Sequence, residues 1–469
     1  MPSNNNNWLT LIIISLGILI SAVNASSINL INPTLARVFN IDIDQVQWVV
    51  TVYLLVVSAL MLLFGRIGDL IGSHKIYNGG FLIFTLGSLF CGLSGDFNLL
   101  LAARVVQGVG AAMLMATGIG IVATTFPLEQ RGQAIGITVI AVGLGNMGGP
   151  TLGGFILTHF TWPMIFYINV PFGIIFFILG LRYLRSPVPE NRNAIPPLDR
   201  IGALLLAILI SALLLCLSGS FKGSGWFVLL FIAILPLFVW YEKRNPAPLF
   251  NFELMRNRRF TVGNLVAFLS YFAQTLIFFL MPFYMEEVLL LPTSTVGVMM
   301  MISPLLMAIA APLSGTMSDK IGALRLMPIA LALQLAAVVF FLNLRADSSL
   351  THLAVGFILL GSSIGMLNSP NNSEIMTAAG FKYSGYASGF VATVRNLAFC
   401  FGTAASAGGF TALFDKFAYT REFIDAYVEA LHLTVIAAAI IVLVSLFFCI
   451  WLKRAQDKID RAQNITDGG

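Results

Sequence analysis

The sequence predicts an all-α polytopic membrane protein, and three observations support this prediction. The chain is 58% hydrophobic and only 10% charged, whereas soluble domains carry roughly 25% charged residues. Its apolar residues fall into long runs, and a bilayer-spanning helix needs about 20 such residues. Its Lys and Arg residues gather in alternate connections between the runs, as expected for the cytoplasmic loops of a membrane protein.

The apolar runs predict fourteen spanning helices. The first run has no basic stretch before it, so we expect a retained helix rather than a cleaved signal peptide. The expected helices cover residues 8–32, 47–64, 77–95, 98–120, 134–157, 164–184, 201–220, 226–241, 261–285, 295–314, 326–344, 352–372, 385–412 and 430–452.

The basic residues orient these helices. With both termini in the cytoplasm, 19 of the 26 Lys and Arg residues fall inside and five fall outside, while Arg104 and Arg395 lie within helices. An error of one helix in the first half would destroy this bias. We therefore expect an integral protein of the cell (inner) membrane with both termini cytoplasmic.

A short motif occurs twice in the chain. GRIGDLIGSHK (65–75) is repeated as GTMSDKIGALR (315–325), at an offset of 250 residues, and each copy is expected in a short cytoplasmic turn. Parallel repeats of this kind indicate two similar halves around a central path. An acid here can hold a helix N-terminus and nearby cations, and so latch one side of the bundle shut, although an ordinary charged loop is the alternative. The candidate gating residues of the two copies are Gly65, Asp69, Gly72, Lys75 and Asp319.

Further motifs extend the pattern over most of the chain. They are LLLAARVVQGVGAA (99–112), GNMGGPTLGG (145–154), WPMIFYINVPFG (162–173) and LDRIG (198–202). Together with the repeated loop, they resemble the major facilitator superfamily, in its fourteen-helix drug:proton antiporter branch. The resemblance implies the major facilitator fold, with two six-helix bundles and an inserted central helix pair. The implied parts are 1–185 (first bundle), 186–258 (inserted helix pair and linkers), 259–455 (second bundle) and 456–469 (cytoplasmic tail).

The glycines of the 145–154 motif indicate a tight helix contact. Gly145, Gly149 and Gly153 recur every four residues and so share one helix face, which permits close packing in lipid. Pro150 adds a kink or flexible point. The resemblance implies that this face is the joint between the two halves, so we expect these residues and Gly154 to act structurally and conformationally.

Polar side chains inside the membrane are candidate substrate contacts. An intramembrane arginine is a functional-site hypothesis that needs partners, and we expect Gln107 and the amides of the first helix to partner Arg104. A structural arginine is the alternative reading. Residues 365–376 are expected to form a polar, proline-broken helix end that frees backbone groups for a cavity. The candidate cavity residues are Asn24, Asn29, Asn32, Arg104, Gln107, Gln274, Asn368, Asn371 and Arg395.

The chain carries no acid in the middle of any expected helix. All 21 acidic residues fall in loops, tails or helix ends. The branch that the chain resembles usually has an Asp in helix 1, within a stretch like LDxTIVNVALP, whereas this chain has VNASSINLINP (23–33) with Asn24 at that place. Proton coupling normally uses a buried carboxylate or histidine. The remaining candidates for coupling are Asp69, Glu286 and Glu374.

These features predict a secondary transporter that exports amphipathic small molecules by alternating access. The alternatives are an exporter or facilitator of an organic anion or metabolite without an embedded proton site, and a non-transporting sensor or scaffold. The chain has no GxxxxGK[ST], HExxH or GxSxG motif, so we expect no enzyme, no cofactor and no metal site. The expected partners are the lipid bilayer and a small-molecule substrate, with protons as an open question, no nucleic acid, and a monomeric state.

Overall fold

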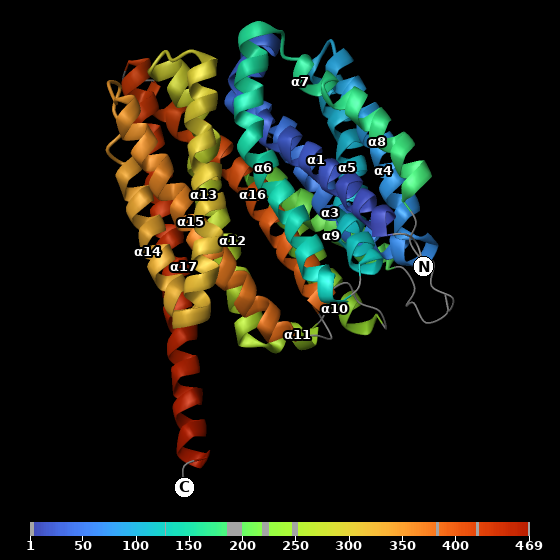
Figure 1. The fold of residues 1–469 in the computed structure, drawn as a ribbon. Coiled ribbons are helices and arrows are strands. Elements are labelled where there is room, and N and C mark those ends of the chain that lie inside the picture. The colour runs from blue at the N-terminus through green and yellow to red at the C-terminus, as the bar shows by residue number, and fades with distance from the viewer. Residues whose placement is uncertain are drawn as a thin grey trace. The chain divides into compact units, whose positions relative to one another are not determined.

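A computed structural model describes residues 4–126, 128–184, 199–217, 225–245, 252–380, 384–418 and 422–467. Every regular element in these ranges is a helix (Figure 1). The chain forms two compact units, each assembled from separate stretches. Unit 1 comprises residues 1–250, 285–301 and 403–409, and unit 2 comprises residues 251–284, 302–402 and 410–469.

Ten helices belong to the first stretch of unit 1. They are α1 (Asn4–Phe39), α2 (Ile43–Val46), α3 (Trp48–Ile71), α4 (Ser73–Leu93), α5 (Phe97–Thr125), α6 (Leu128–His159), α7 (Met164–Tyr167), α8 (Asn169–Tyr183), α9 (Arg200–Leu217) and α10 (Gly225–Arg244).

The remaining helices build most of unit 2, while α13, α16 and the π-helical turn that follows α12 also contribute residues to unit 1. They are α11 (Phe252–Arg256), α12 (Arg258–Phe283) with a π-helical turn (Tyr284–Val288), α13 (Thr293–Ile321), α14 (Ala323–Phe341), α15 (Leu350–Ala379), α16 (Ser384–Ala418) and α17 (Phe423–Asp467).

The spanning helices agree with the sequence prediction in position. Twelve helical spans within the described ranges are long and apolar enough to cross a membrane. The predicted runs 134–157 and 201–220 correspond to α6 and α9, which are helical but do not belong to those twelve. The all-α membrane fold is therefore confirmed, while the count of fourteen spanning helices is confirmed only for twelve.

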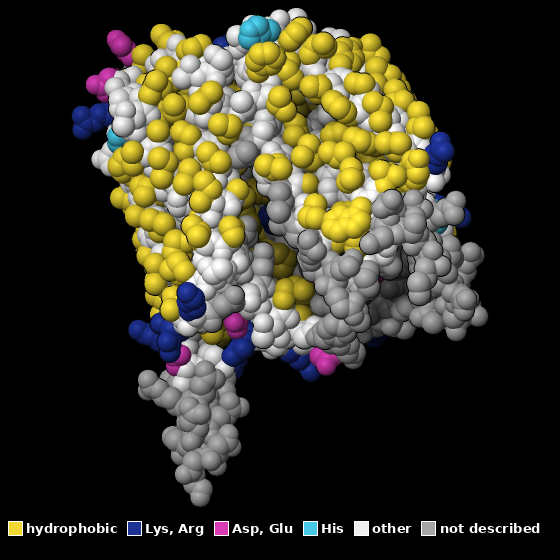
Figure 2. Space-filling model, in the orientation of Figure 1, with side chains coloured by type: hydrophobic (Ala, Val, Ile, Leu, Met, Phe, Trp, Pro, Cys, Tyr) yellow, Lys and Arg dark blue, Asp and Glu magenta, His cyan; other side chains and the backbone are white. Residues whose placement is uncertain are grey.

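Hydrophobic side chains cover the flanks of the molecule. Figure 2 shows them along the length of the α13–α14 side of unit 2, with charged side chains gathered near the two ends of that unit. In unit 1, Leu229, Ile232 and Trp240 of α10 are all more than half exposed. Apolar side chains exposed along an entire helix have no favourable solvent except hydrocarbon, so these surfaces fit a lipid environment.

The repeated motif is mostly helical rather than a loop. Helix α3 continues to Ile71, and Gly72 alone joins it to α4 with φ 104°. In the second copy, Gly322 joins α13 to α14 with φ 90°. Only glycine adopts such a conformation at low cost, so each connection reverses the chain within one residue. The expected short turn is thus a single residue in both copies.

The expected helix break near residue 370 is wrong. Helix α15 runs unbroken from Leu350 to Ala379 with Pro370 inside it. Ser349 caps its start by accepting a hydrogen bond from the His352 backbone, and Gly380 ends it with φ 67°. A proline removes one ladder hydrogen bond, but neighbouring helices in a membrane bundle stabilise the rest of the helix.

Candidate functional site

Unit 1 encloses a polar cluster around Arg104 of α5. The Arg104 side chain is 0% exposed, donates from Nε to the Val49 carbonyl at 2.8 Å, and donates from Nη1 to Gln107 Oε1. Its guanidinium also lies 4.2 Å from the centre of the Tyr53 ring. A buried charge is tolerated only when it is hydrogen-bonded, and a cation over an aromatic face adds further attraction.

Gln107 and Asn24 continue this cluster toward the other helices. Gln107 Nε2 donates to Ser88 Oγ at 2.8 Å and to Asn24 Oδ1 at 3.2 Å. Asn169 Nδ2 donates to the same Asn24 oxygen at 3.3 Å, and the Asn24 amide lies beside the Tyr53 hydroxyl. The structure shows the expected contact of Arg104 with Gln107. The expected partnership of Arg104 with a helix-1 amide is indirect, because Asn24 bonds to Gln107 and Gln107 bonds to Arg104.

The glycine motif of α6 packs directly against α1. A Cβ on Gly149 would collide with Ser26 Oγ, and a Cβ on Gly145 would lie 2.6 Å from Ala22 Cβ. Ser27 Oγ donates to the Gly149 carbonyl at 2.8 Å, so the close approach also forms a hydrogen bond between the helices. This is the small-residue packing that membrane helices use in place of a hydrophobic driving force.

Gly153 and Gly154 of the same motif also lie close to neighbouring segments, though less closely than Gly149. A Cβ on Gly153 would lie 3.2 Å from Leu30, and one on Gly154 would lie 3.2 Å from the Thr293 carbonyl. Pro150 is buried inside continuous α6.

The other two α1 amides differ from Asn24. Asn29 is partly exposed. Asn32 is fully buried, and neither polar atom of its amide has a hydrogen-bond partner among the described residues. Buried amides are usually hydrogen-bonded, so Asn32 is unusual, because its side chain does not hold α1 to a neighbouring helix through a hydrogen bond among the described residues.

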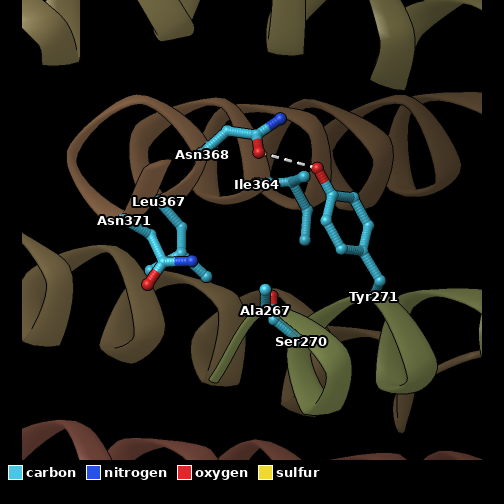
Figure 3. Close-up of a pocket in the computed structure, with 7 residues that line it drawn as sticks. All are labelled: Ala267, Ser270, Tyr271, Ile364, Leu367, Asn368 and Asn371. Carbon is cyan, nitrogen blue, oxygen red and sulfur yellow. Dashed lines mark hydrogen bonds between the residues drawn. The ribbon is translucent and has the colours of Figure 1, made fainter. Parts of the chain in front are cut away.

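Unit 2 contains a small pocket between α12 and α15, with a cavity volume of about 10 Å³, which is about the space that one water molecule needs. Its polar lining residues include Tyr271 and Asn368, and the Tyr271 hydroxyl donates to Asn368 Oδ1 at 2.7 Å. Figure 3 shows these two side chains pointing toward each other from α12 and α15. The lining residues are Ala267, Ser270, Tyr271, Ile364, Leu367, Asn368 and Asn371.

Arg395 of α16 also reaches this group. It is partly buried and hydrogen-bonds the Tyr271 side chain. The Tyr271 ring packs edge-on against Phe399, with ring centres 5.3 Å apart. Gln274 lies one turn along α12 from Tyr271, and its buried Oε1 atom has no hydrogen-bond partner among the described residues. The structure therefore brings Arg395 and Asn368 together around a tyrosine.

Two further amides in unit 2 are tied to neighbouring helices. Asn371 is 2% exposed and donates to the Gly263 carbonyl at 3.1 Å. Gln334 Nε2 donates to the Ser270 carbonyl while Ser270 Oγ donates to Gln334 Oε1. These bonds hold α12 against α14 and α15, and so fix the two sides of the pocket.

Two candidate coupling carboxylates each pair with an arginine. Glu286, in the π-helical turn, lies 2.6 Å from Arg37. Glu374 of α15 is 8% exposed and lies 3.3 Å from Arg259 of α12. An exchangeable pairing of this kind lets a carboxylate alternate between a protonated form and an ion pair. The side chains of Asp69 and Asp319 lie outside the described residues.

The other motif residues of the 65–75 copy are placed at the end of α3 and the start of α4. Gly65 lies within α3. A Cβ added at Gly65 would lie 3.9 Å from the Ala116 carbonyl oxygen of α5, so the α3–α5 contact has room for a small side chain there. Gly72 forms the turn, and Lys75 is exposed. The proposed latch depends on Asp69 and so stays a prediction.

Sequence reasoning missed several residues of both clusters. Tyr53, Ser88 and Asn169 were not expected in unit 1, and neither Tyr271 nor Ser270 was expected in unit 2. Single tyrosines and serines are common in membrane helices, so composition alone does not select them. Tyr271 had one usable signal, because it shares an α12 face with Gln274 three residues later.

Comparisons with known proteins identify the family. The family model described as "Major Facilitator Superfamily" matches residues 14–403. The chain is 39% identical over 454 residues to "Riboflavin transporter RibZ" of Clostridioides difficile (strain 630), covering 96% of this chain and 98% of the relative. It is 30% identical to "Multidrug resistance protein Stp" of Mycobacterium tuberculosis (strain CDC 1551 / Oshkosh), covering 84% of this chain and 74% of that one.

A solved structure shares the fold. The chain matches a bacterial homologue of the human lysosomal transporter Spinster, in an inward-facing and unoccupied conformation, with a TM-score of 0.72. The sequences are 15% identical, and the match covers 96% of this chain and 98% of the other. At this level of identity the likeness concerns the fold alone.

Proposed function

Because this chain belongs to the major facilitator superfamily, we propose that it is a secondary transporter of riboflavin or a similarly planar, uncharged small molecule. The observation that carries this proposal is the 39% identity to a riboflavin transporter along nearly the whole of both chains. Transport would proceed by alternating access, as the repeated halves suggest. Similarity confined to one motif would support only the family, but this similarity covers 96% of this chain and 98% of the relative.

The polar groups of the two units support an uncharged substrate. The clusters offer amides, a tyrosine and two arginines, and no carboxylate contacts either of them among the described residues. A cationic drug would need a buried counter-charge, whereas hydroxyl and carbonyl groups of a neutral ligand are matched by amide and guanidinium donors. Asn24 also favours an uncharged substrate, because it places a neutral amide where the related antiporters usually have an acid.

Export of amphipathic drugs is the second candidate. It is favoured by the 30% identity to a multidrug resistance protein and by the tight α1–α6 contact of the Gly145–Gly154 motif, which resembles a motif of antiporters. In this case Glu286 or Glu374 would carry the proton, since each is buried beside one arginine. Such an antiporter would sit in the cell membrane as a monomer, with both termini cytoplasmic.

Flux in proteoliposomes tests the proposal directly. Purified protein is reconstituted, and riboflavin movement is followed by fluorescence with and without an imposed pH gradient, alongside a cationic dye. We expect saturable riboflavin counterflow that empty liposomes lack. Dye movement driven by the gradient, without any riboflavin counterflow, would overturn the riboflavin proposal and favour drug antiport.

Glutamine variants of the two carboxylates then test coupling. If riboflavin accumulates against its gradient when a pH gradient is present, Glu374→Gln or Glu286→Gln is expected to abolish that accumulation while counterflow continues. Asp347→Asn, in an exposed turn, is the matched control. Accumulation that survives in both glutamine variants would exclude these residues as the proton carriers.

A further inference from the structure

The ring of Tyr271 is held firmly between three helices of unit 2. Tyr271 of α12 is 7% exposed and packs with Ile364 of α15 and Ala398 of α16 in one apolar cluster. The ring also lies edge-on against Phe399 of α16, with ring centres 5.3 Å apart. A close-packed aromatic side chain has little rotational freedom, so the surrounding helices fix the position of its hydroxyl group.

A close contact between α12 and α16 adds to this rigidity. A Cβ on Gly402 of α16 would lie 2.7 Å from Thr275 Cβ and 3.2 Å from the Phe272 carbonyl oxygen of α12. Thr275 Oγ1 in turn donates to the Tyr271 carbonyl at 2.8 Å. Small residues let membrane helices approach each other in this way. The contact therefore fixes the separation of Tyr271 from the helix that carries Arg395.

The Tyr271 hydroxyl bonds two polar side chains at once. It donates its single proton to Asn368 Oδ1 of α15 at 2.7 Å, as Figure 3 shows. It also accepts a hydrogen bond from Arg395 of α16, because an arginine side chain has only donors. Since its proton is bonded to Asn368, the hydroxyl presents a lone pair to the guanidinium, and each bond supports the direction of the other.

Arg395 keeps other donors for a ligand. A guanidinium carries five N–H groups in a rigid fork, and the bond to Tyr271 engages only part of it. Arg395 is also only partly buried. A long side chain loses rotamer freedom when a ligand immobilises it, and a side chain that is already held loses less. The tyrosine therefore reduces the entropy that a ligand must remove when it binds to Arg395.

The surroundings of Tyr271 leave it no direct contact with a substrate. The pocket beside it has a cavity volume of about 10 Å³, which suits one water molecule and no larger ligand. Its hydroxyl proton is bonded to Asn368. Tyr271 can thus act on a ligand through Arg395.

We propose that Tyr271 is a positioning residue, which holds the Arg395 guanidinium in the orientation that binds the transported molecule. The inference rests on the proposed function, and it adds a residue that affects substrate affinity without touching the substrate. Ring packing fixes the hydroxyl, and the hydroxyl restrains the arginine.

Tyr271→Phe tests this role, because it removes the hydroxyl and keeps the ring that packs against Phe399. In the riboflavin counterflow assay, the half-saturating concentration is expected to rise about tenfold, because the substrate must then order Arg395 itself. The maximal rate should stay within about twofold of wild type. A lower maximal rate at an unchanged half-saturating concentration would show a merely structural role and overturn the proposal, as would wild-type kinetics.

Tyr284→Phe is the matched control. The Tyr284 hydroxyl donates to the Arg345 carbonyl, so this variant also removes a tyrosine hydrogen bond within unit 2. Its half-saturating concentration should equal that of wild type. An equal rise in both variants would overturn the assignment to Tyr271.

The chemical reactivity of Arg395 tests the contact without any substrate. Phenylglyoxal modifies accessible guanidinium groups, and mass spectrometry of the digested protein follows its reaction at Arg395 in detergent. Tyr271→Phe should accelerate this reaction severalfold, because the guanidinium is released, while Arg104, which is 0% exposed, stays unmodified. An unchanged rate at Arg395 would overturn the proposal whatever the counterflow result.

The reactivity measurement also separates the two proposals. If wild-type protein shows no riboflavin counterflow, the proposed function fails. A faster reaction of Arg395 in Tyr271→Phe would still support the positioning role in that case. An unchanged reaction together with normal riboflavin counterflow would leave the proposed function standing and overturn the role of Tyr271.

Discussion

The two arginine-centred clusters are built from similar residues but differ in exposure and bonding. In unit 1, Arg104 is 0% exposed and bonds a backbone carbonyl and Gln107. In unit 2, Arg395 is only partly buried, and its tyrosine partner lines a pocket. An arginine surrounded by its own protein holds helices together, whereas one beside a pocket has donors left for a ligand. We therefore expect Arg104 to govern stability and Arg395 to govern transport.

The largest effect is expected from Arg104→Ala. It leaves the Val49 carbonyl and Gln107 Oε1 without their donor and opens a cavity inside unit 1, which should lower stability by about 3 kcal/mol or more. The thermal unfolding temperature of the purified protein measures the loss, and Arg345→Ala in an exposed turn is the control. A variant that unfolds like wild type yet fails to transport would place Arg104 in the substrate site instead.

Arg395→Ala is expected to abolish transport without affecting folding. The change removes a donor beside the pocket, but Arg395 is partly exposed and its loss leaves no large buried cavity. Riboflavin counterflow and the unfolding temperature should be measured on the same preparation. If the unfolding temperature falls as far as in Arg104→Ala, the contrast between the two clusters is wrong.

Gly149→Ala should have an intermediate effect within unit 1. Its new methyl group would collide with Ser26 Oγ and separate α6 from α1, a kind of overpacking that costs about 1–3 kcal/mol. Gly148→Ala is a close control, because a Cβ at Gly148 meets nothing within 4 Å. Unfolding temperature and counterflow should fall together in the first variant and hold steady in the second. Equal behaviour of the two would show that the α1–α6 contact is not tight.

The smallest effect is expected from Asn32→Leu. The fully buried Asn32 amide has no partner among the described residues, so an apolar side chain of similar size should leave stability unchanged or slightly higher. Unfolding temperature and counterflow again provide the measurements. A sharp loss of transport at unchanged stability would add Asn32 to the substrate contacts. Unit 1 would then take part in substrate binding as unit 2 is expected to do.

The sequence was informative where one strong physical rule applied. Length and hydropathy predicted the positions of the helices, because an apolar run of about 20 residues satisfies its backbone groups in hydrocarbon by forming a helix. The cost of burying a charge predicted that Arg104 would be paired, and its contact with Gln107 agrees with that prediction, while Asn24 of α1 joins through Gln107 instead of bonding to Arg104 directly. The matching motifs predicted the superfamily that the comparisons show.

The sequence was less informative where tertiary packing decides. Proline predicts a break at Pro370, but flanking helices support α15 through that position. Tyr53 and Tyr271 partner the arginines, yet the sequence separates them poorly from tyrosines that face lipid, since only Tyr271 has a signal, a helix face shared with Gln274. The pairing of Gln334 with Ser270 joins residues 64 positions apart, which no local pattern reveals.

The one-residue connections at Gly72 and Gly322 have a consequence for how this chain can evolve. A helix advances about 100° per residue, so one inserted residue must either rotate the next helix by that angle or rebuild the turn. Rotation would carry the inward face of α4 or α14 into lipid. The amino-acid sequences of the two repeats can therefore diverge by substitution while their lengths stay constant. The two single-glycine joints preserve a record of the original duplication that substitution alone does not erase.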